Sequence, residues 1–275
     1  MTIFDEMVAA FNPQNPTEKN NAQHEVMQRI ALSGLYRAGF FEHAAFYGGT
    51  CLRIFHDLRR FSEDMDFTLV EKNPNVHLED CFPQVIEAFK LTGREVTIKK
   101  KDKKTFGKVE SAFLKDNTDV YDIAFQTEKT IKVKIELDTN PPLGFETEQR
   151  PLFKPFAFMT RCVTLPYLYA GKMHALAFRN WKTRVKGRDW YDFEWYVGNK
   201  IPLDFAHLQH RIYEFNGIEM SKDDFMTVLK ERLASTDMEV VKDDVLRFLR
   251  TDPHELDIWS NAYFLQLADM IVFKE

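Results

Sequence analysis

Two aspartates separated by a single residue, Asp64 and Asp66, form the most chemically suggestive pattern in this sequence. In a β-strand, residues two apart point to the same face and lie roughly 6.5–7 Å from each other. Carboxylates held side by side repel one another unless a cation lies between them. A divalent ion such as Mg²⁺, which prefers oxygen ligands, removes that conflict. The spacing therefore predicts a metal site.

A glycine pair followed by threonine, Gly48-Gly49-Thr50, precedes these aspartates. Glycine lets a ligand approach the backbone closely. We expect Thr50 to be the N-cap of a short helix that extends to about Leu58. The N–H groups at the start of such a helix bind phosphate. If the short strand before the glycines is the antiparallel neighbour of the strand at 65–70, the phosphate-binding turn lies beside the metal-binding pair.

A third carboxylate is expected from the segment Ile131–Asp138, where apolar and polar residues alternate as in a half-buried strand. Its polar face offers Glu136, with Asp138 as the less favoured choice. Together with Asp64 and Asp66, such a carboxylate completes a two-metal site.

A second group of charged residues lies further along the chain. Lys172 falls in a helical pattern, and Asp189 and Asp192 share one face of a later helix by their i, i+3 spacing. A lysine ammonium suits the charge of a triphosphate. Asp192 could act as a base or orient Lys172, and the whole group could instead be a solvated, salt-bridged surface. The segment between Lys172 and Asp189 is basic and contains Lys182, Arg184, Lys186 and Arg188.

The hydrophobic pattern predicts an α+β protein, with a mixed-sheet core followed by an all-helical C-terminal half. We expect a loose arm at 1–19, a core at 20–165, and a helical domain at 166–275 that completes the active site. Helices are expected at 20–38, 75–90, 166–179, 188–197, 203–215, 221–234, 238–250 and 254–272. Strands are expected at 65–70, 94–100, 105–114, 119–127, 130–138 and 152–164.

Composition limits the function classes. The formal net charge is −5, whereas proteins that coat nucleic acid are usually basic. No helix-turn-helix pattern is evident, so we expect no sequence-specific DNA binding. Three widely spaced cysteines suit a reducing compartment. The sequence shows no signal peptide and no apolar run of the ~20 residues that span a membrane. We therefore expect a cytoplasmic protein without membrane contact.

Two pairs of motifs carry a resemblance to a known family. The runs Tyr47–Arg53 and Arg60–Phe67 resemble the first motif of AbiEii-type nucleotidyltransferases, toxins within the DNA polymerase β-like superfamily. The runs Gly171–Leu176 and Arg188–Asp192 resemble the later motif of that family, a helical lysine followed by an Arg-Asp-x-x-Asp box. The resemblance covers residues 40–197 in order, and the Arg-Phe-Ser-x-Asp-x-Asp-Phe run is its most specific part.

The resemblance implies a polymerase β-like core, Mg²⁺ or Mn²⁺ as cofactor, and an NTP as substrate. It implies that Asp64 and Asp66 bind metal, while no motif assigns Glu136. By the same resemblance, Lys172 and the two aspartates after it are active-site residues, and a tRNA acceptor and an antitoxin encoded alongside are typical. The NTP contacts expected within these motifs are Gly48, Gly49, Thr50, Ser62, Lys172 and Arg188.

The working hypothesis is a metal-dependent nucleotidyltransferase that moves a nucleoside monophosphate from an NTP to an acceptor hydroxyl on RNA or protein. We expect it to be the toxin of a bacterial toxin–antitoxin or phage-defence system. Glycosyltransferases also use Asp-x-Asp, but the series of βα units typical of them is missing. A catalytically inactive interaction protein with the same fold is a second alternative, and a DNA-binding regulator is the least favoured.

Overall fold

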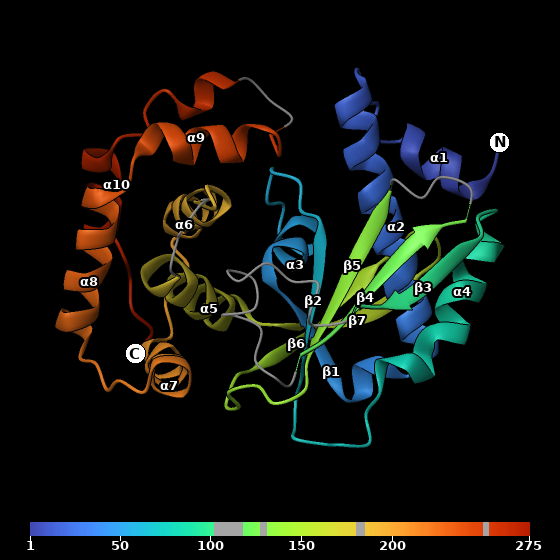
Figure 1. Cartoon of the computed structure of the whole chain (residues 1–275), viewed down its shortest axis with the longest axis horizontal. Coiled ribbons are helices and arrows are strands. Elements are labelled where there is room, and N and C mark those ends of the chain that lie inside the picture. The colour runs from blue at the N-terminus through green and yellow to red at the C-terminus, as the bar shows by residue number, and fades with distance from the viewer. Residues whose placement is uncertain (102–117, 127–130, 180–184, 250–252) are drawn as a thin grey trace. The chain divides into compact units, whose positions relative to one another are not determined.

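A computed structural model of the chain describes residues 1–101, 118–126, 131–179, 185–249 and 253–275 (Figure 1). The chain divides into two compact units. Unit 1 comprises Met1–Asp57, Phe61–Leu143 and Thr147–Cys162, and unit 2 comprises Leu58–Arg60, Gly144–Glu146 and Val163–Glu275. In the part of the chain that is described, no helix is long and apolar enough to cross a membrane.

Unit 1 is built on a mixed β-sheet. Its strands are β1 Ala44–Tyr47, β2 Asp64–Leu69, β3 Val96–Lys100, β4 Thr118–Phe125, β5 Lys132–Asp138, β6 Thr147–Leu152 and β7 Phe158–Val163. Within the described residues these seven strands lie in the order β3-β4-β5-β2-β1-β7-β6. Strand β2 pairs with β5, and β1 with β7, in parallel. The pairs β1–β2, β3–β4 and β4–β5 are antiparallel. The predicted α+β class with a mixed sheet is confirmed.

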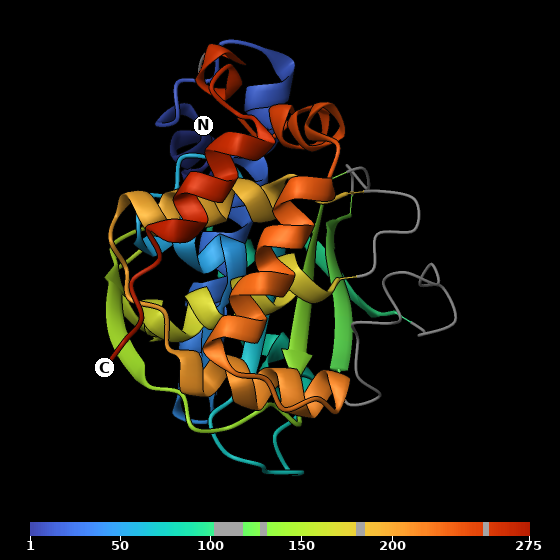
Figure 2. The ribbon, with the colours of Figure 1, turned by 90° about the vertical axis from the view of Figure 1, so that its left-hand side faces the viewer.

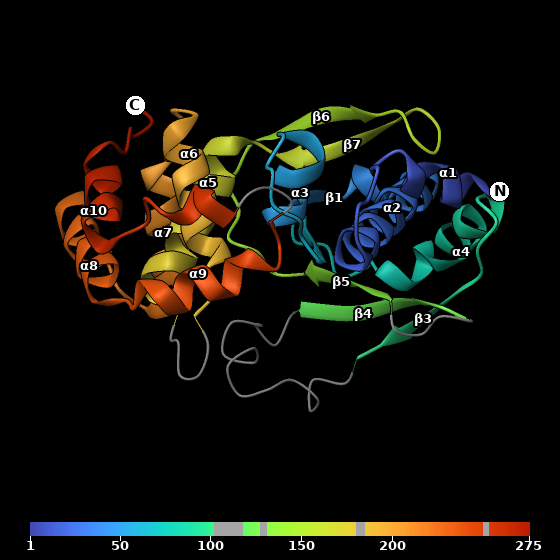
Figure 3. The same ribbon diagram turned by 90° about the horizontal axis from the view of Figure 1, so that it is seen from above.

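Helices cover the apolar face of this sheet. Those of unit 1 are α1 Ile3–Ala9, α2 Pro16–Arg37, α3 Gly48–Phe55 and α4 Phe82–Leu91, with short 3₁₀ helices η1 Phe40–Glu42 and η2 Leu78–Cys81. Viewed from above, α2 and α4 lie between the β6–β7 end and the β3–β4 end of the sheet, which curves around them (Figure 3). Strand β5 alternates as predicted, because Val133, Ile135 and Leu137 are buried and the residues between them are partly exposed.

Aromatic side chains fill the middle of this core. The Phe46 ring stacks on Phe67 with centroids 5.0 Å apart, and Phe40 meets the same ring edge-on at 5.3 Å. Burying one such side chain stabilises the fold by about 1.5–3 kcal/mol. These contacts join β1, β2 and η1, and so hold the strand that carries Asp64 and Asp66 in the centre of the sheet.

The N-terminal residues differ from the expected loose arm, because they form α1 and the start of α2. Thr2 caps α1 and exchanges hydrogen bonds with Asp5, which is the reciprocal capping box. The Asn15 side chain accepts a hydrogen bond from the Glu18 N–H and so caps α2, whose first residue is Pro16. Asparagine followed by proline is favoured at a helix start, where asparagine caps the helix and proline is its first residue.

Unit 2 is helical, as predicted. Its helices are α5 Leu165–Phe178, α6 Arg188–Gly198, α7 Phe205–Asn216, α8 Lys222–Ser235, α9 Met238–Leu246 and α10 Asn261–Asp269. Helix α8 packs against α10 (Figure 2). The single helix expected at 254–272 is wrong. A 3₁₀ helix, η4 Pro253–Leu256, precedes α10, and the Ser260 hydroxyl caps α10 as a new helix.

One strand of the sheet was not predicted, and one predicted strand cannot be compared with the structure. Strand β6 was missed, because it lies at the edge of the sheet and contains Pro151, which weakens the sequence signal of a strand. The strand expected at 105–114 lies outside the described residues.

Candidate active site

The predicted carboxylates lie on neighbouring strands of unit 1. Because β2 and β5 are parallel, Asp66 is the register partner of Glu136, and Asp64 is the partner of Lys134. Residues paired in register point to the same face of a sheet. The neighbour on the other side, β1, is antiparallel and places Tyr47 opposite Asp66, so the end of β1 lies beside the start of β2. Asp64, Asp66 and Glu136 therefore share one face of the sheet, and we call them the carboxylate cluster.

The glycine turn lies against this cluster. Gly48 has a φ of +79°, in the left-handed region that favours glycine. A Cβ atom at this position would overlap the carboxylate of Asp66. Glycine therefore allows Asp66 to approach the start of α3, where the backbone N–H groups of Gly49 and Thr50 belong to the first, electropositive turn.

The predicted role of Thr50 as a helix N-cap is wrong. Helix α3 begins three residues earlier than predicted, with Tyr47 in the N-cap position. Thr50 is fully buried, and its hydroxyl donates a hydrogen bond to the carbonyl oxygen of Asp64. Glycine at position 48 takes the positive φ that turns the chain from β1 directly into α3, and the Tyr47 side chain makes no capping hydrogen bond. Thr50 thereby ties α3 to the first residue of β2.

The loop before Asp64 is held from the opposite side by α2. The buried side-chain amide of Gln28 donates to the carbonyl oxygens of Ser62 at 2.8 Å and of Glu63 at 3.0 Å. These bonds, together with that of Thr50, fix the backbone at the entrance of β2. The expectation that Ser62 contacts the NTP stays a prediction, and the structure places its backbone in this anchor.

A lysine that was not predicted as a site residue lies within the carboxylate cluster. The Lys134 Nζ is 2.7 Å from Glu136 Oε1 and 3.3 Å from Asp64 Oδ2. Burial by itself lowers the pKa of Lys134, but the charges of Asp64 and Glu136 outweigh burial and hold that pKa above its ordinary value. Lys134 is therefore a cation among the three carboxylates. Its place on the polar face of the 131–138 pattern was the available signal.

The donor chemistry of the cluster suits a divalent cation, since three carboxylates on one face supply the oxygen ligands that Mg²⁺ and Mn²⁺ prefer. Asp138 is the less suitable third ligand, because it pairs in register with Thr68 and one of its oxygens accepts from the Asn140 N–H at 3.0 Å. Among the described residues, however, no three acidic, histidine or cysteine side chains converge into a ready-made metal cluster. The ammonium of Lys134 bridges two of the carboxylates instead.

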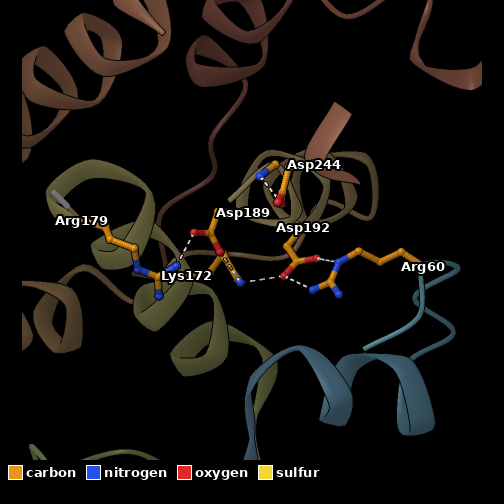
Figure 4. A network of polar contacts seen from close by, with 7 residues as sticks. Arg60, Lys172, Arg179, Asp189, Asp192 and Asp244 are labelled. Carbon is orange, nitrogen blue, oxygen red and sulfur yellow. Dashed lines mark hydrogen bonds and ion pairs between the residues drawn. The ribbon is translucent and has the colours of Figure 1, made fainter. Parts of the chain in front are cut away.

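Unit 2 contains the second predicted group, which is a buried ion-pair network (Figure 4). The Lys172 Nζ lies 2.8 Å from Asp189 Oδ1 and 2.7 Å from Asp192 Oδ2. The Arg179 Nη1 lies 2.8 Å from the other oxygen of Asp189. The side chains of Asp189 and Asp192 are 4% and 0% exposed. The alternative interpretation of these residues as a solvated surface is therefore wrong.

Arg60 completes this network and was not predicted. Its Nε and Nη2 atoms each lie 2.6 Å from an oxygen of Asp192, and both side chains are buried. A paired contact of this kind is the geometry that arginine offers to a carboxylate. The sequence showed Arg60 within the first motif, but no spacing rule links it to Asp192, which is 132 residues away.

These contacts act on the charge of both aspartates. Burial by itself raises the pKa of Asp189, but Lys172 and Arg179 outweigh it and hold that pKa below its ordinary value. The pKa of Asp192 is likewise lowered, because Arg60 and Lys172 outweigh the effect of burial. A carboxylate with a lowered pKa and both oxygens engaged is a poor base. This favours orientation of Lys172 over the base role for Asp192.

The start of α6 is held by α9. Asp244 accepts a hydrogen bond from the Gly187 N–H at 2.9 Å (Figure 4). A Cβ on Gly187 would clash with the Val241 carbonyl oxygen, so glycine permits this close packing. The guanidinium of Arg188 lies 4.3 Å from the centre of the Phe248 ring. Its expected contact with the NTP stays a prediction. Lys182 and Arg184, in the basic segment, lie outside the described residues.

The family can be identified from comparison with known proteins. The profile of the family described as "Nucleotidyl transferase AbiEii toxin, Type IV TA system" matches residues 30–266. The chain belongs to the AbiEii family. This AbiEii protein is thus a member of a family of nucleotidyltransferase toxins from toxin–antitoxin systems, and the resemblance noted from its motifs is confirmed.

Solved structures of other proteins have a fold similar to that of this chain. JHP933 from Helicobacter pylori shares 18% identity, with a TM-score of 0.53 over 91% of this chain and 90% of that protein. MenT4, a nucleotidyltransferase toxin from Mycobacterium tuberculosis H37Rv, shares 16% identity, with a TM-score of 0.52 over 96% of this chain and 99% of its own. At these identities the likeness concerns the fold alone. Comparison with curated proteins finds no significant match.

Proposed function

We propose that this AbiEii protein transfers a nucleoside monophosphate from an NTP to an acceptor hydroxyl, in a reaction that depends on Mg²⁺ or Mn²⁺. The observation that carries the proposal is the carboxylate cluster of Asp64, Asp66 and Glu136 on one face of the sheet, with the start of α3 against Asp66. Carboxylates beside a phosphate-binding helix start are what a metal–triphosphate complex requires.

In the proposed reaction, the acceptor hydroxyl attacks the α-phosphorus of the NTP, the bond to the bridging oxygen breaks, and pyrophosphate leaves. Divalent ions held by the carboxylate cluster would supply positive charge that activates the hydroxyl and stabilises the leaving oxygen. The N–H groups of Gly49 and Thr50 bind triphosphate oxygens. Rigid placement of Asp64 by Thr50 keeps the ligands in position, since the geometry of such sites decides their rate.

We assign Lys172 to the neutralisation of triphosphate charge, with Asp189 and Asp192 as positioning residues. The support is that both aspartates engage the Lys172 ammonium at 2.7–2.8 Å and are themselves held by arginines. We propose that the carboxylate cluster and this network are both needed for the same transfer. RNA such as the 3′ end of tRNA, or a protein, is the proposed acceptor, and a cognate antitoxin is the proposed partner.

The test uses purified protein with each α-³²P-labelled NTP, Mg²⁺, total RNA and lysate protein. We expect one class of macromolecule to take the label, and Asp64→Asn to abolish labelling while the melting temperature stays close to that of the wild type. Asp119→Asn is the matched control, because Asp119 pairs in register with Leu137 and so lies on the opposite face of the same sheet. Labelling by Asp64→Asn at the wild-type rate would rule out this site.

A further inference from the structure

Lys134 occupies a specific place between two residues that are proposed to bind metal. It lies on β5, opposite Asp64 and two residues before Glu136, so all three side chains share one face of the sheet. Its ammonium is 2.7 Å from Glu136 Oε1 and 3.3 Å from Asp64 Oδ2, and its side chain is 20% exposed. The lysine therefore bridges the two strands that carry the carboxylate cluster.

The charges explain why a cation belongs there. Three carboxylates on one face repel one another, and removal from water strengthens that repulsion. Among Asp64, Asp66, Glu136 and Lys134 the formal charge is −2, which one divalent ion balances. Asp64 and Glu136 cannot offer all of their carboxylate oxygens to a metal ion while they bind the Lys134 ammonium.

We propose that Lys134 is a built-in counter-cation of the carboxylate cluster, which keeps Asp64 and Glu136 in place without metal and lowers the affinity for divalent ions. When an ion binds, Lys134 gives up at least one of its two contacts. The inference rests on the proposed function, because it takes the carboxylates to be metal ligands. It adds that Lys134 sets the concentration of Mg²⁺ or Mn²⁺ at which the site is filled.

The experiment measures Mn²⁺ binding to the full chain by calorimetry, without nucleotide, together with melting temperature in EDTA and in Mn²⁺. Lys134→Met removes the competing charge, so we expect about tenfold tighter Mn²⁺ binding. It also removes the counter-charge, so we expect a lower melting temperature in EDTA and a larger rise on adding Mn²⁺. Lys134→Gln, which keeps a hydrogen-bond donor without the charge, should show the same tightening and serves if the methionine variant does not fold.

Two controls separate the outcomes. Lys132→Met changes the exposed residue on the same strand and face, and should bind Mn²⁺ as the wild type does. Asp64→Asn should lose Mn²⁺ binding. If binding depends on Asp64 but neither Lys134 variant binds more tightly than the wild type, the inference about Lys134 is overturned and the metal site stands. If the wild type shows no binding that depends on Asp64, the proposed metal site and this inference both fall.

Discussion

Replacing Arg60 by methionine, which has a similar length and no charge, tests whether the buried network of unit 2 holds that unit together. The change removes two hydrogen bonds of 2.6 Å to Asp192, whose side chain is 0% exposed. Removing one partner of a buried ion pair costs about 3–5 kcal/mol, because the other charge stays buried. Since Lys172 still contacts Asp192 at 2.7 Å, we expect a loss of about 3 kcal/mol, the lower end of that range.

Intrinsic fluorescence can follow this unfolding selectively. All four tryptophans of the sequence lie between residues 181 and 259, and the three that the structure describes belong to unit 2. Urea unfolding of the Arg60→Met variant, followed by tryptophan emission, should show a lower free energy of unfolding than the wild type. Arg60→Lys keeps the charge but cannot offer two nitrogens to one carboxylate, so its loss should be smaller than that of Arg60→Met.

Lys230→Met provides the matched control within the same unit. Lys230 pairs with Asp269 at 2.5 Å, and the two side chains are 42% and 64% exposed. Exposed pairs of this kind contribute about 0–1 kcal/mol. The reasoning is refuted if Arg60→Met loses no more stability than Lys230→Met, because the buried pair would then contribute no more than a surface pair.

Two further predictions concern the glycine turn and acid pH. Gly48→Ala should lose roughly 1–2 kcal/mol of stability, because alanine is strained at this positive φ. It should also weaken Mn²⁺ binding, because the new Cβ displaces Asp66. Gly144→Ala is the control: its φ is +87° and no atom lies within 4 Å of the added Cβ, so it should lose stability without weakening Mn²⁺ binding. Because the pKa of Asp189 is lowered in the folded chain, the folded chain binds fewer protons at acid pH than the unfolded chain. The stability that the ionised Asp189 contributes is therefore complete above the unfolded pKa of about 3.9 and is lost as the pH falls below it. Tryptophan-detected melting from pH 7 to pH 2.5 should show the loss, and Asp189→Asn should flatten it; an unchanged acid limb in that variant would contradict the assignment.

Local patterns in the sequence determined most of the secondary structure of this protein and the faces on which its charged residues lie. Period-two alternation identified β5, and period-3.6 patterns identified most helices of unit 2. The Asp-x-Asp spacing placed Asp64 and Asp66 on one face, and i, i+3 spacing placed Asp189 beside Asp192. These predictions succeeded because each depends on neighbours within one or two turns or strand steps.

The tertiary structure decided what local spacing does not contain. Parallel pairing of β2 with β5 joins segments some seventy residues apart, and its register selects Glu136 over Asp138 as the neighbour of Asp66. The same pairing brings Lys134 between carboxylates, and the folding of unit 2 brings Arg60 to Asp192. Whether a charged residue becomes a solvated side chain or a buried counter-ion depends on the partner that the fold supplies, and the residue's own position in the chain does not specify that partner.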